Sequence, residues 1–359
     1  MTKWHLLLGL SMVACTGDVT EEEDPTPLVD QFGFEDERSF TLIADSAEDL
    51  DVPRDLGFNP SSPDQLWIVN RATDSTTIIF DAGTEEQDWE NRVDVFANHF
   101  MEEVSSLSFG ENNAFATCQE SMNTYDGSSA PNGFMGPALW PGDLDVYAVA
   151  NQNPWGSMLG SHLDMLHQSP LCMGAEWISG NTYWIFDGKN ENLVMYDFQE
   201  DHGPGGDDHS DGIVRRHSDV ELTRLEDVPS HMALNHETFD LFIANTGEGE
   251  VLWVDASSGD ENRNLSQNLE PLEEYTDWTD TDHEVFADDF EEPSGVWLHG
   301  DVLFVSDHAT GEIVALDMNG DELERIDTGA EAIMGITVGP EGKLWYVDAG
   351  ANELVRIDP

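Results

Sequence analysis

Six segments of the chain repeat one pattern of short strands, and this repetition limits the possible fold more than any other feature. Each segment has a short apolar strand, a tight turn, a stronger strand that usually ends in Asn or Asp, a polar turn and a third strand, as in "LWYVDAGANELVRID". Alternating hydrophobicity, β-branched and aromatic residues, and turns of Gly, Asn, Asp and Pro are typical of strands. The six segments begin at Val52, Glu103, Leu171, Val228, Glu292 and Ala332.

The spacing of these segments predicts the architecture. The innermost strands begin near Pro53, Val104, Cys172, Pro229, Pro293 and Ile333, which are 51, 68, 57, 64 and 40 residues apart. Propeller blades repeat at roughly 40–50 residues, and longer spacings mean inserted loops. Five further strands are predicted in "RVDVF", "LDVYAVA", "VELTRL", "HEVF" and "ELERI", and the last blade takes its fourth strand from "SFTLIAD" at 39–45. We therefore predict an all-β protein, one six-bladed β-propeller of four-stranded blades over residues 34–359, closed by an N-terminal strand.

The blade pattern resembles that of the NHL-repeat propeller superfamily, which includes gluconolactonase-like and amidating-lyase propellers. The likeness covers nearly the whole chain after the N-terminal segment, and it implies a fold but no function. Amidating lyases hold zinc with a His in a "PH" pattern that opens three blades, whereas here only "PSHMAL" is similar and His231 is shifted by one position. The gluconolactonase-like group uses a Glu on an early innermost strand, where this chain has Arg54 and Asp55. The resemblance therefore does not transfer either activity directly.

The N-terminus "MTKWHLLLGLSMVAC" has a basic start, an apolar run and a small residue before Cys15. The run is too short to span a bilayer as a mature helix. It resembles a bacterial lipoprotein signal, which implies that residues 1–15 form the signal and that Cys15 is lipidated. Thr16 then favours the outer membrane, with the protein facing the periplasm or the cell surface. An ordinary cleaved secretory signal is the alternative, and both place the mature protein outside the cytoplasm.

Residues 16–33 are acidic and contain Pro, which predicts a flexible tether, so that the lipid is the protein's only membrane contact. The protein then has two further cysteines, Cys118 and Cys172, and an oxidising compartment predicts a disulfide between them.

The charge of the chain excludes one class of partner. Asp and Glu number 74 against 13 Lys and Arg, for a formal net charge of -61. Such a surface repels phosphate backbones, which argues against nucleic-acid binding. The simplest explanation for this charge is solubility in a salty medium, where ions screen the repulsion.

We expect the protein to be a monomer.

The connections of a four-stranded blade divide between two faces. We call the top face the one that carries the connections into the first strand and between the second and third strands. Two insertions predicted there, 118–138 and 151–170, hold few acids and are rich in Met, Trp, Asn and Gly, and we interpret them as a lid over the channel near blades 2 and 3. The acid-rich segments 199–219 and 257–282 are predicted at the opposite, bottom face.

Polar residues at the top channel mouth predict a site for a small molecule or a protein ligand. The alignment of the first strands gives one channel-facing position, occupied by Asp55, Ser106, Gly174, His231, Gly295 and Gly335. Arg54 and Arg71 suit a bidentate clamp on a carboxylate or phosphate, or they neutralise Asp55 and other acids of the rim. The candidate ligand-binding residues are Arg54, Asp55, Asn70, Arg71, Asp187, Asn245, Asp307 and Asp348.

Histidines at the same mouth predict a zinc or copper site. His162 and His167 flank Asp164 in "HLDMLH", and His231 and His308 are expected on the rim. The alternative is that these histidines bond loop backbone. In the stretch "DHGPGGDDHSDGIVRRH", Asp207, Asp208 and Asp211 either hold a structural calcium or form a solvated turn.

Two functions remain open at this stage. The first is a non-catalytic envelope lipoprotein that binds a ligand or partner at its top face. The second is a metal-dependent hydrolase or lyase in which an ion held by His and Asp activates water.

Overall fold

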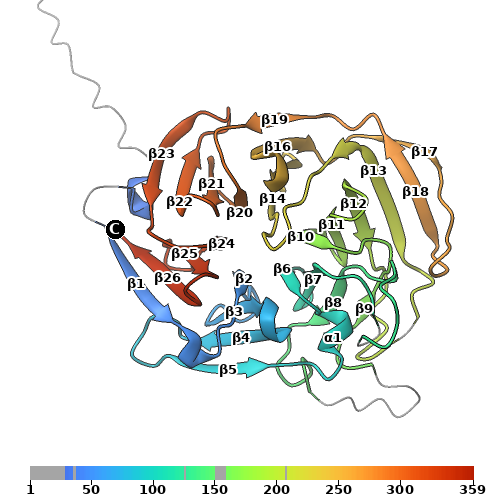
Figure 1. Cartoon of the computed structure of the whole chain (residues 1–359), viewed down its shortest axis with the longest axis horizontal. Coiled ribbons are helices and arrows are strands. Elements are labelled where there is room, and N and C mark those ends of the chain that lie inside the picture. The colour runs from blue at the N-terminus through green and yellow to red at the C-terminus, as the bar shows by residue number, and fades with distance from the viewer. Residues whose placement is uncertain (1–28, 35–37, 125–126, 150–158, 207) are drawn as a thin grey trace, which may run out of the picture.

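Six sheets lie in a ring around a common axis, which confirms the predicted six-bladed propeller (Figure 1). The computed structural model describes residues 29–34, 38–124, 127–149, 159–206 and 208–359. Cys15, the signal segment 1–15 and most of the proposed tether lie outside the described residues, as does Asp207.

Each blade is built around an innermost first strand, with the following strands stacked outwards in antiparallel order. Blade 1 consists of β2 (Pro53–Phe58), β3 (Gln65–Asn70), β4 (Ser75–Phe80) and β5 (Asp88–Arg92). Blade 2 consists of β6 (Val104–Phe109), β7 (Ala114–Gln119), β8 (Ala138–Pro141) and β9 (Asp164–Met165). Blade 3 begins with β10 (Cys172–Ser179), β11 (Thr182–Asp187), β12 (Asn192–Asp197) and β13 (Ile213–Glu221).

The other three blades repeat this order. Blade 4 consists of β14 (Met232–Leu234), β15 (Asp240–Asn245), β16 (Glu250–Asp255) and β19 (His283–Ala287). Blade 5 consists of β20 (Pro293–His299), β21 (Val302–Asp307), β22 (Glu312–Leu316) and β23 (Glu322–Asp327). Blade 6 consists of β24 (Ile333–Val338), β25 (Leu344–Asp348), β26 (Glu353–Asp358) and β1 (Ser39–Ala44).

Helical structure in the described residues is short. The one α-helix, α1 (Ala97–Phe100), lies between blades 1 and 2 in the chain. The remaining turns of helix are the 3-10 elements η1 (Asp30–Phe32), η2 (Ser46–Glu48), η3 (Arg71–Thr73) and η4 (Thr246–Glu248).

Blade 6 combines strands from both ends of the described chain. β1 runs antiparallel to β26, with Ser39 opposite Asp358. The segment before β1 is also packed: Val29, Phe32 and Phe34 are buried in the hydrophobic cluster of blades 5 and 6. These three residues therefore add to the contact between blades 5 and 6.

The hydrophobic core divides into six clusters, one at each contact between neighbouring blades. At the contact of blades 1 and 2, Trp67 and Phe115 are fully buried, and their ring centroids lie 5.2 Å apart in an edge-on arrangement. Both faces of a blade are covered by its neighbours, so the middle strands are apolar at nearly every position. This is why the second strands stood out in the sequence.

Three outer strands differ from the prediction. In blade 2, "LDVYAVA" was expected to form the fourth strand, but residues 144–149 form turns and bends, and β9 takes the outer position. In blade 1 the fourth strand is β5, which ends where "RVDVF" begins. In blade 3 a hairpin of β17 (Asp260–Asn264) and β18 (Glu274–Thr279) pairs in parallel with β13 and widens the sheet to six strands. Outer strands are half exposed and polar, so their sequence pattern is weak.

The predicted disulfide is confirmed. Cys118 on β7 is bonded to Cys172 on β10, and their Cα atoms lie 5.0 Å apart. The bond joins blade 2 to blade 3. Among the described residues, no helix has the length and apolar character needed to cross a membrane.

Candidate functional site in the central channel

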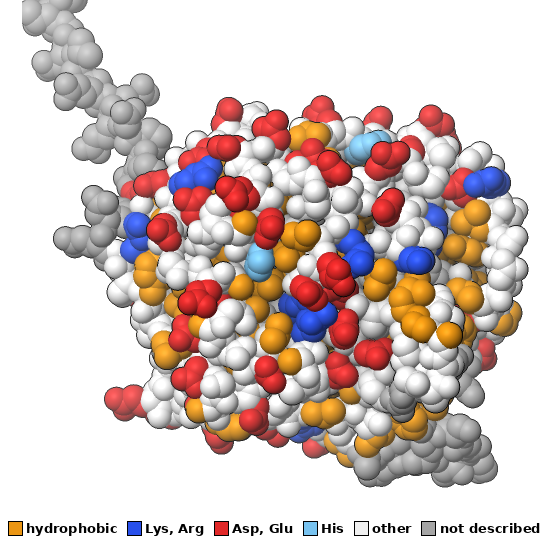
Figure 2. Space-filling view, in the orientation of Figure 1, with side chains coloured by type: hydrophobic (Ala, Val, Ile, Leu, Met, Phe, Trp, Pro, Cys, Tyr) orange, Lys and Arg blue, Asp and Glu red, His pale blue; other side chains and the backbone are white. Residues whose placement is uncertain are grey.

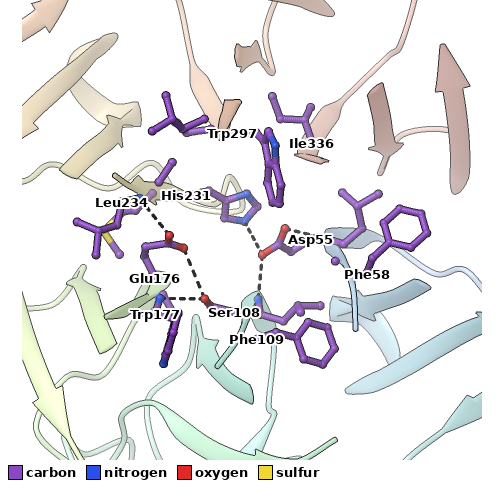
Figure 3. Close-up of a pocket in the computed structure, with 18 of the residues that line it drawn as sticks. Asp55, Phe58, Ser108, Phe109, Glu176, Trp177, His231, Leu234, Trp297 and Ile336 are labelled. Atoms are coloured by element: carbon purple, nitrogen blue, oxygen red, sulfur yellow. Dashed lines mark hydrogen bonds and ion pairs between the residues drawn. The ribbon is translucent and has the colours of Figure 1, made fainter. Parts of the chain in front are cut away.

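A cavity of about 360 Å³ lies on the axis of the ring and is lined by the innermost strands of all six blades (Figure 3). Its lining runs from the middle of most of these strands to their ends and into the turns that follow them, which contribute Pro60 and His236. The cavity therefore lies toward the bottom face, whereas the sequence analysis placed the site at the top mouth. The residues that carry its chemistry are Asp55, Glu176, Trp177, His231 and Trp297.

The channel is filled at the level where the inner strands begin. Ser105, Ser230 and Ser294 are fully buried there. At the next position of two strands, a side chain has no room: a Cβ on Gly174 would lie 2.0 Å from the carbonyl oxygen of Ser230, and a Cβ on Gly295 would lie 2.5 Å from that of Met334. Glycine permits this close approach of neighbouring inner strands. The glycines at the aligned position thus close the channel above the cavity.

Asp55 and His231 form a polar pair at this closed end. The Asp55 carboxylate accepts hydrogen bonds from the backbone N–H of Leu56 at 2.8 Å and of Leu107 at 2.9 Å. The Nε2 atom of His231 lies 3.6 Å from Oδ2 of Asp55 and donates to the carbonyl oxygen of Ser105 at 3.1 Å. Because a carbonyl only accepts, His231 carries a proton on Nε2. The pKa of Asp55 is raised because the carboxyl group is buried, and the nearby His231 offsets only part of this rise.

Glu176 is a second carboxyl group in the cavity, held on the wall by fixed donors. Its Oε1 accepts from the backbone N–H of Leu234 at 3.0 Å. Its Oε2 lies 3.5 Å from the hydroxyl of Ser108, and that hydroxyl accepts from the backbone N–H of Trp177 at 3.0 Å. Burial is the main cause that raises the pKa of Glu176 to about 8, and the nearby Asp55 charge adds to it. Glu176 is therefore largely protonated at pH 7, and it can donate or accept a hydrogen bond.

Aromatic and apolar side chains surround these polar groups. Trp177 and Trp297 lie on opposite sides of the cavity, and Phe58 and Phe109 complete the wall between them (Figure 3). The arrangement joins apolar walls to a few fixed polar groups, which is the usual composition of a small-molecule site.

The sequence analysis identified Asp55 and His231 but missed Glu176, Trp177 and Trp297. A usable signal was present, because Glu176 follows the aligned Gly174 by two residues on the same inner strand, and side chains two apart share a face of a strand. Acidic residues on inner strands are rare in this chain, and Asp55 and Glu176 both point to the same cavity.

The other polar candidates at the strand ends fasten turns and do not line the cavity. Asn70 accepts from the backbone N–H of Asp51 at 3.0 Å, and Asn245 from that of Thr223 at 2.7 Å. These contacts join the end of a second strand to the segment that leads toward a first strand, and they explain the recurrence of Asn and Asp at this position. Asp187, Asp307 and Asp348 accept two or more backbone N–H groups each.

The two arginines of the top face are engaged by acids other than Asp55. Arg54 is fully buried, and its Nη2 lies 3.0 Å from Oε2 of Glu120. Arg71 lies 3.2 Å from Glu103 and 2.6 Å from Asp227. Both guanidinium groups thus neutralise acids of the top face, which matches the second of the two interpretations given above.

The four histidines predicted as one metal site lie in three places. His231 lines the channel cavity, whereas His162 and His167 flank β9 on the outer edge of blade 2. The Nδ1 atom of His308 lies 2.6 Å from Oε2 of Glu292, just outside the inner strand of blade 5. Since an ion needs its ligands around one point, the structure does not unite these four residues into one centre.

The insertion that ends in "HLDMLH" and the aspartate-rich loop, expected on opposite faces, are in contact. The backbone N–H of Gly205 donates to the carbonyl oxygen of His162 at 2.8 Å, and Nδ1 of His209 lies 2.7 Å from Oδ1 of Asp164. Within the loop, Asp208 accepts from Ser210 and Asp211 lies 2.9 Å from His202. The two segments can meet because β9 is only two residues long, and the chain on either side of it runs along the outer edge of the blade.

The surface of the protein is acidic, as the excess of Asp and Glu in the sequence predicts. Acidic side chains are spread over most of the face shown in Figure 2, and several of the few basic side chains there lie beside acids. Such a field attracts cations toward the protein.

Comparisons with known proteins support the fold. No family model and no curated protein matches the chain. Among solved structures, it is similar to an auxiliary nutrient binding protein from Bacteroides ovatus, with a TM-score of 0.56 and 10% identity over 90% of this chain and 76% of the other. It is similar to a luciferin-regenerating enzyme, with a TM-score of 0.54 and 10% identity over 89% and 96% of the two chains. Regucalcin from Agrobacterium tumefaciens, described as a calcium-binding protein, gives a TM-score of 0.52 and 12% identity over 88% and 93%.

The chain is therefore a six-bladed β-propeller, as its blade pattern predicted, and its fold is similar to that of regucalcin. At these identities the likeness establishes the fold alone.

Proposed function

We propose that this protein binds a small organic molecule in the cavity of its central channel. The observation that carries the proposal is the lining, in which fixed polar groups and aromatic walls from six blades converge on one space. The volume of about 360 Å³ falls in the range of small-molecule sites. Two residues that the sequence analysis expected at the top mouth, Asp55 and His231, line this cavity.

The groups of the cavity favour a ligand that carries hydroxyl or ammonium groups. Asp55 accepts hydrogen bonds, and Glu176 both donates and accepts, while Trp177 and Trp297 offer flat faces for C–H groups or a cation. The net charge of -61 further favours a neutral or cationic ligand over an anion.

The cellular context of the proposal is the envelope. The resemblance of residues 1–15 to a lipoprotein signal supports a protein anchored through Cys15 to the outer membrane. The similarity to a Bacteroides propeller described as an auxiliary nutrient binding protein supports the capture of a nutrient. In this proposal the protein acts as a monomer. The disulfide fits an oxidising compartment.

A second candidate is a hydrolase or lyase that uses the same cavity. Its support is that Glu176, with a pKa of about 8, and the Asp55–His231 pair are titratable groups in one enclosed space. Glu176 would protonate a leaving group, and His231 would move a proton at the opposite side. A metal-dependent form would require an ion beside Asp55 and His231.

The test is a thermal-shift screen of the domain without residues 1–15 against sugars, polyols and amines, followed by calorimetric titration of each hit. We expect at least one ligand whose affinity falls about tenfold or more in Glu176→Gln and in Trp297→Ala. Trp278→Phe is the matched control, because Trp278 lies on the outer hairpin and does not line the cavity. A ligand that binds both cavity variants as tightly as the wild type would exclude the channel site. Turnover of a hit would favour the enzyme over the binding protein.

A further inference from the structure

A second cluster of ionisable side chains lies on the outer edge of blade 2, far out from the channel (Figure 1). Its members come from the segment around β9, from the loop between β12 and β13, and from the loop between β17 and β18. Four segments that are distant in the sequence meet here when α1, which carries His99, is included. The residues are His99, His162, Asp164, His167, His202, His209, Asp211 and Glu270.

Two imidazoles in this cluster are each fixed by a carboxylate. The Nδ1 atom of His167 lies 2.8 Å from Oε2 of Glu270, and the other oxygen of Glu270 accepts the backbone N–H of His167 at 2.5 Å. The Nδ1 atom of His209 lies 2.7 Å from Oδ1 of Asp164. Because an ionised carboxylate only accepts hydrogen bonds, Nδ1 of each ring carries the proton and donates it. Nε2 of each ring then keeps its lone pair. Histidines that bind metals are commonly oriented by this pairing.

Three buried polar atoms of the cluster have no hydrogen-bond partner within the described part of the chain. They are Nε2 of His162, Nε2 of His167 and Oδ2 of Asp164, in residues that are 0%, 2% and 1% exposed. A buried polar atom without a partner is costly, so proteins rarely leave several together. Each of these atoms has a lone pair to offer.

The donors form two adjoining groups, and within each group the distances suit one ion. One ligand atom each of His167, His209 and Glu270 lies within 4.8 Å of the others, and the same holds for Asp164, His202 and Asp211. Asp164 joins the two groups through its bond to His209. Calcium prefers a shell of oxygens alone, whereas imidazole together with carboxylate suits zinc, copper or nickel.

The orientation of one imidazole is fixed before any ion arrives. The ring of His167 is stacked on Phe134, with centroids 3.6 Å apart. An imidazole that is already held in place reduces the cost of binding an ion.

We propose that this edge cluster binds one divalent transition-metal ion, with His167, His209 and Asp164 as ligands and Glu270 as the residue that orients His167. The ion would join β9 of blade 2 to the loops of blade 3 and of the outer hairpin. Its role is to stabilise this edge of the ring, and it is separate from the ligand site in the channel.

The test is titration of the metal-free domain, produced without a histidine tag, with Zn²⁺ and with Cu²⁺ by calorimetry, and elemental analysis of the dialysed protein. We expect one bound equivalent of at least one of these metals and a higher melting temperature in its presence. In the double variant His167→Gln/His209→Gln we expect this binding to be lost, and in Glu270→Gln we expect about 10–100-fold weaker binding. Melting of each variant without metal shows whether it is folded.

Two matched controls separate this site from other histidines. His283→Gln changes an exposed imidazole outside the cluster, and His231→Gln changes the channel. Both should bind the metal as the wild type does. Weak binding that is equal in all variants, or no bound equivalent in a folded wild-type protein, would overturn the proposal. Loss of binding in His231→Gln alone would also overturn it, since the metal would then lie in the channel.

Discussion

Glu176 is the residue whose environment has the clearest measurable consequence. Its pKa is about 8 in the fold against an ordinary value of 4.5, so the folded protein binds a proton between these values that the unfolded chain releases. A raised folded pKa contributes stability that is fully present below pH 4.5 and is lost as the pH rises through 8. Above that range the folded protein holds an uncompensated carboxylate beside Asp55.

We therefore predict that Glu176→Gln stabilises the protein at pH 8–9 and has little effect near pH 4. The amide has nearly the same shape and carries no charge, so the benefit grows with pH by about 1 kcal/mol or more. The measurement is the denaturant midpoint of wild type and variant between pH 4 and 9. Ser108→Ala is a useful comparison, because it removes a neighbour of Glu176 and leaves the carboxyl in place. A difference between Glu176→Gln and wild type that stays constant across this range would contradict a raised pKa.

The buried histidines should act in the opposite direction. His99, His162 and His217 have pKa values of about 4, 3 and 4, below the ordinary 6.5. The unfolded chain therefore takes up protons that the fold refuses, and stability falls as the pH drops from about 6.5 toward 4. We predict that His162→Phe flattens this acid slope, since Phe can keep the stack on Phe100. Urea midpoints at pH 7 and pH 4.5 check it: a variant that loses as much stability as the wild type between these values would refute the assignment.

Residues of the site were only partly predictable for a geometric reason. Alignment of repeats locates a channel-facing position, and Asp55 and His231 followed from it. It cannot show how deep the open space lies, because depth depends on where glycines let the strands close. Gly174 and Gly295 close the channel above the cavity, and this placed the site one step further along the inner strands, at Glu176.

At the level of elements, the disulfide between β7 and β10 is the main covalent constraint. Its two cysteines are 54 residues apart in the sequence, and the enclosed segment includes β8, β9 and the part of the edge cluster from His162 to His167. In the chain-entropy description, such a bond stabilises a fold mainly by restricting the unfolded chain.

We predict that Cys118→Ala/Cys172→Ala lowers the free energy of unfolding by about 2–5 kcal/mol. Guanidinium unfolding of the variant and of the oxidised wild type measures this difference. Wild type kept in a reducing agent should resemble the variant, because both lack the bond. The two proteins then differ only in the volume of the side chains at these two positions. If neither loses stability, the bond contributes nothing beyond the packing of the two blades.

Elements were predictable in proportion to their burial. Second strands such as β3 and β25 are apolar up to their polar ends, because neighbouring blades cover both of their faces, and these strands could be located from the sequence. β9 has two residues and β17 is exposed along its length, so neither leaves a periodic signal. The contact of the aspartate-rich loop with the segment around β9 depends on these outer strands, and the sequence therefore assigned them to opposite faces.

For the whole molecule, the number of blades could be read from the chain, whereas the assembly of the edges could not. Six inner strands at spacings of 40–68 residues favour a ring, because an open array of blades leaves one face of the first blade and one face of the last blade uncovered. The hairpin of β17 and β18, by contrast, pairs in parallel with β13 through long-range contacts that no local pattern contains.

Charge is the property that acts on the ring as a whole. The net charge is -61, and the acids are distributed over the surface rather than paired, since only 13 basic residues are present. The Debye length falls from roughly 30 Å at 0.01 M salt to about 3 Å at 1 M, so added salt removes repulsion between blades more than it weakens the few ion pairs. We predict that the melting temperature rises by several degrees from 0.02 to 1 M NaCl. KCl at the same concentrations should give the same rise, because screening depends on ionic strength and not on the cation. A melting temperature that is flat or falls with both salts would mean that the pairs of Arg54, Arg216 and Arg325 outweigh the repulsion among the acids.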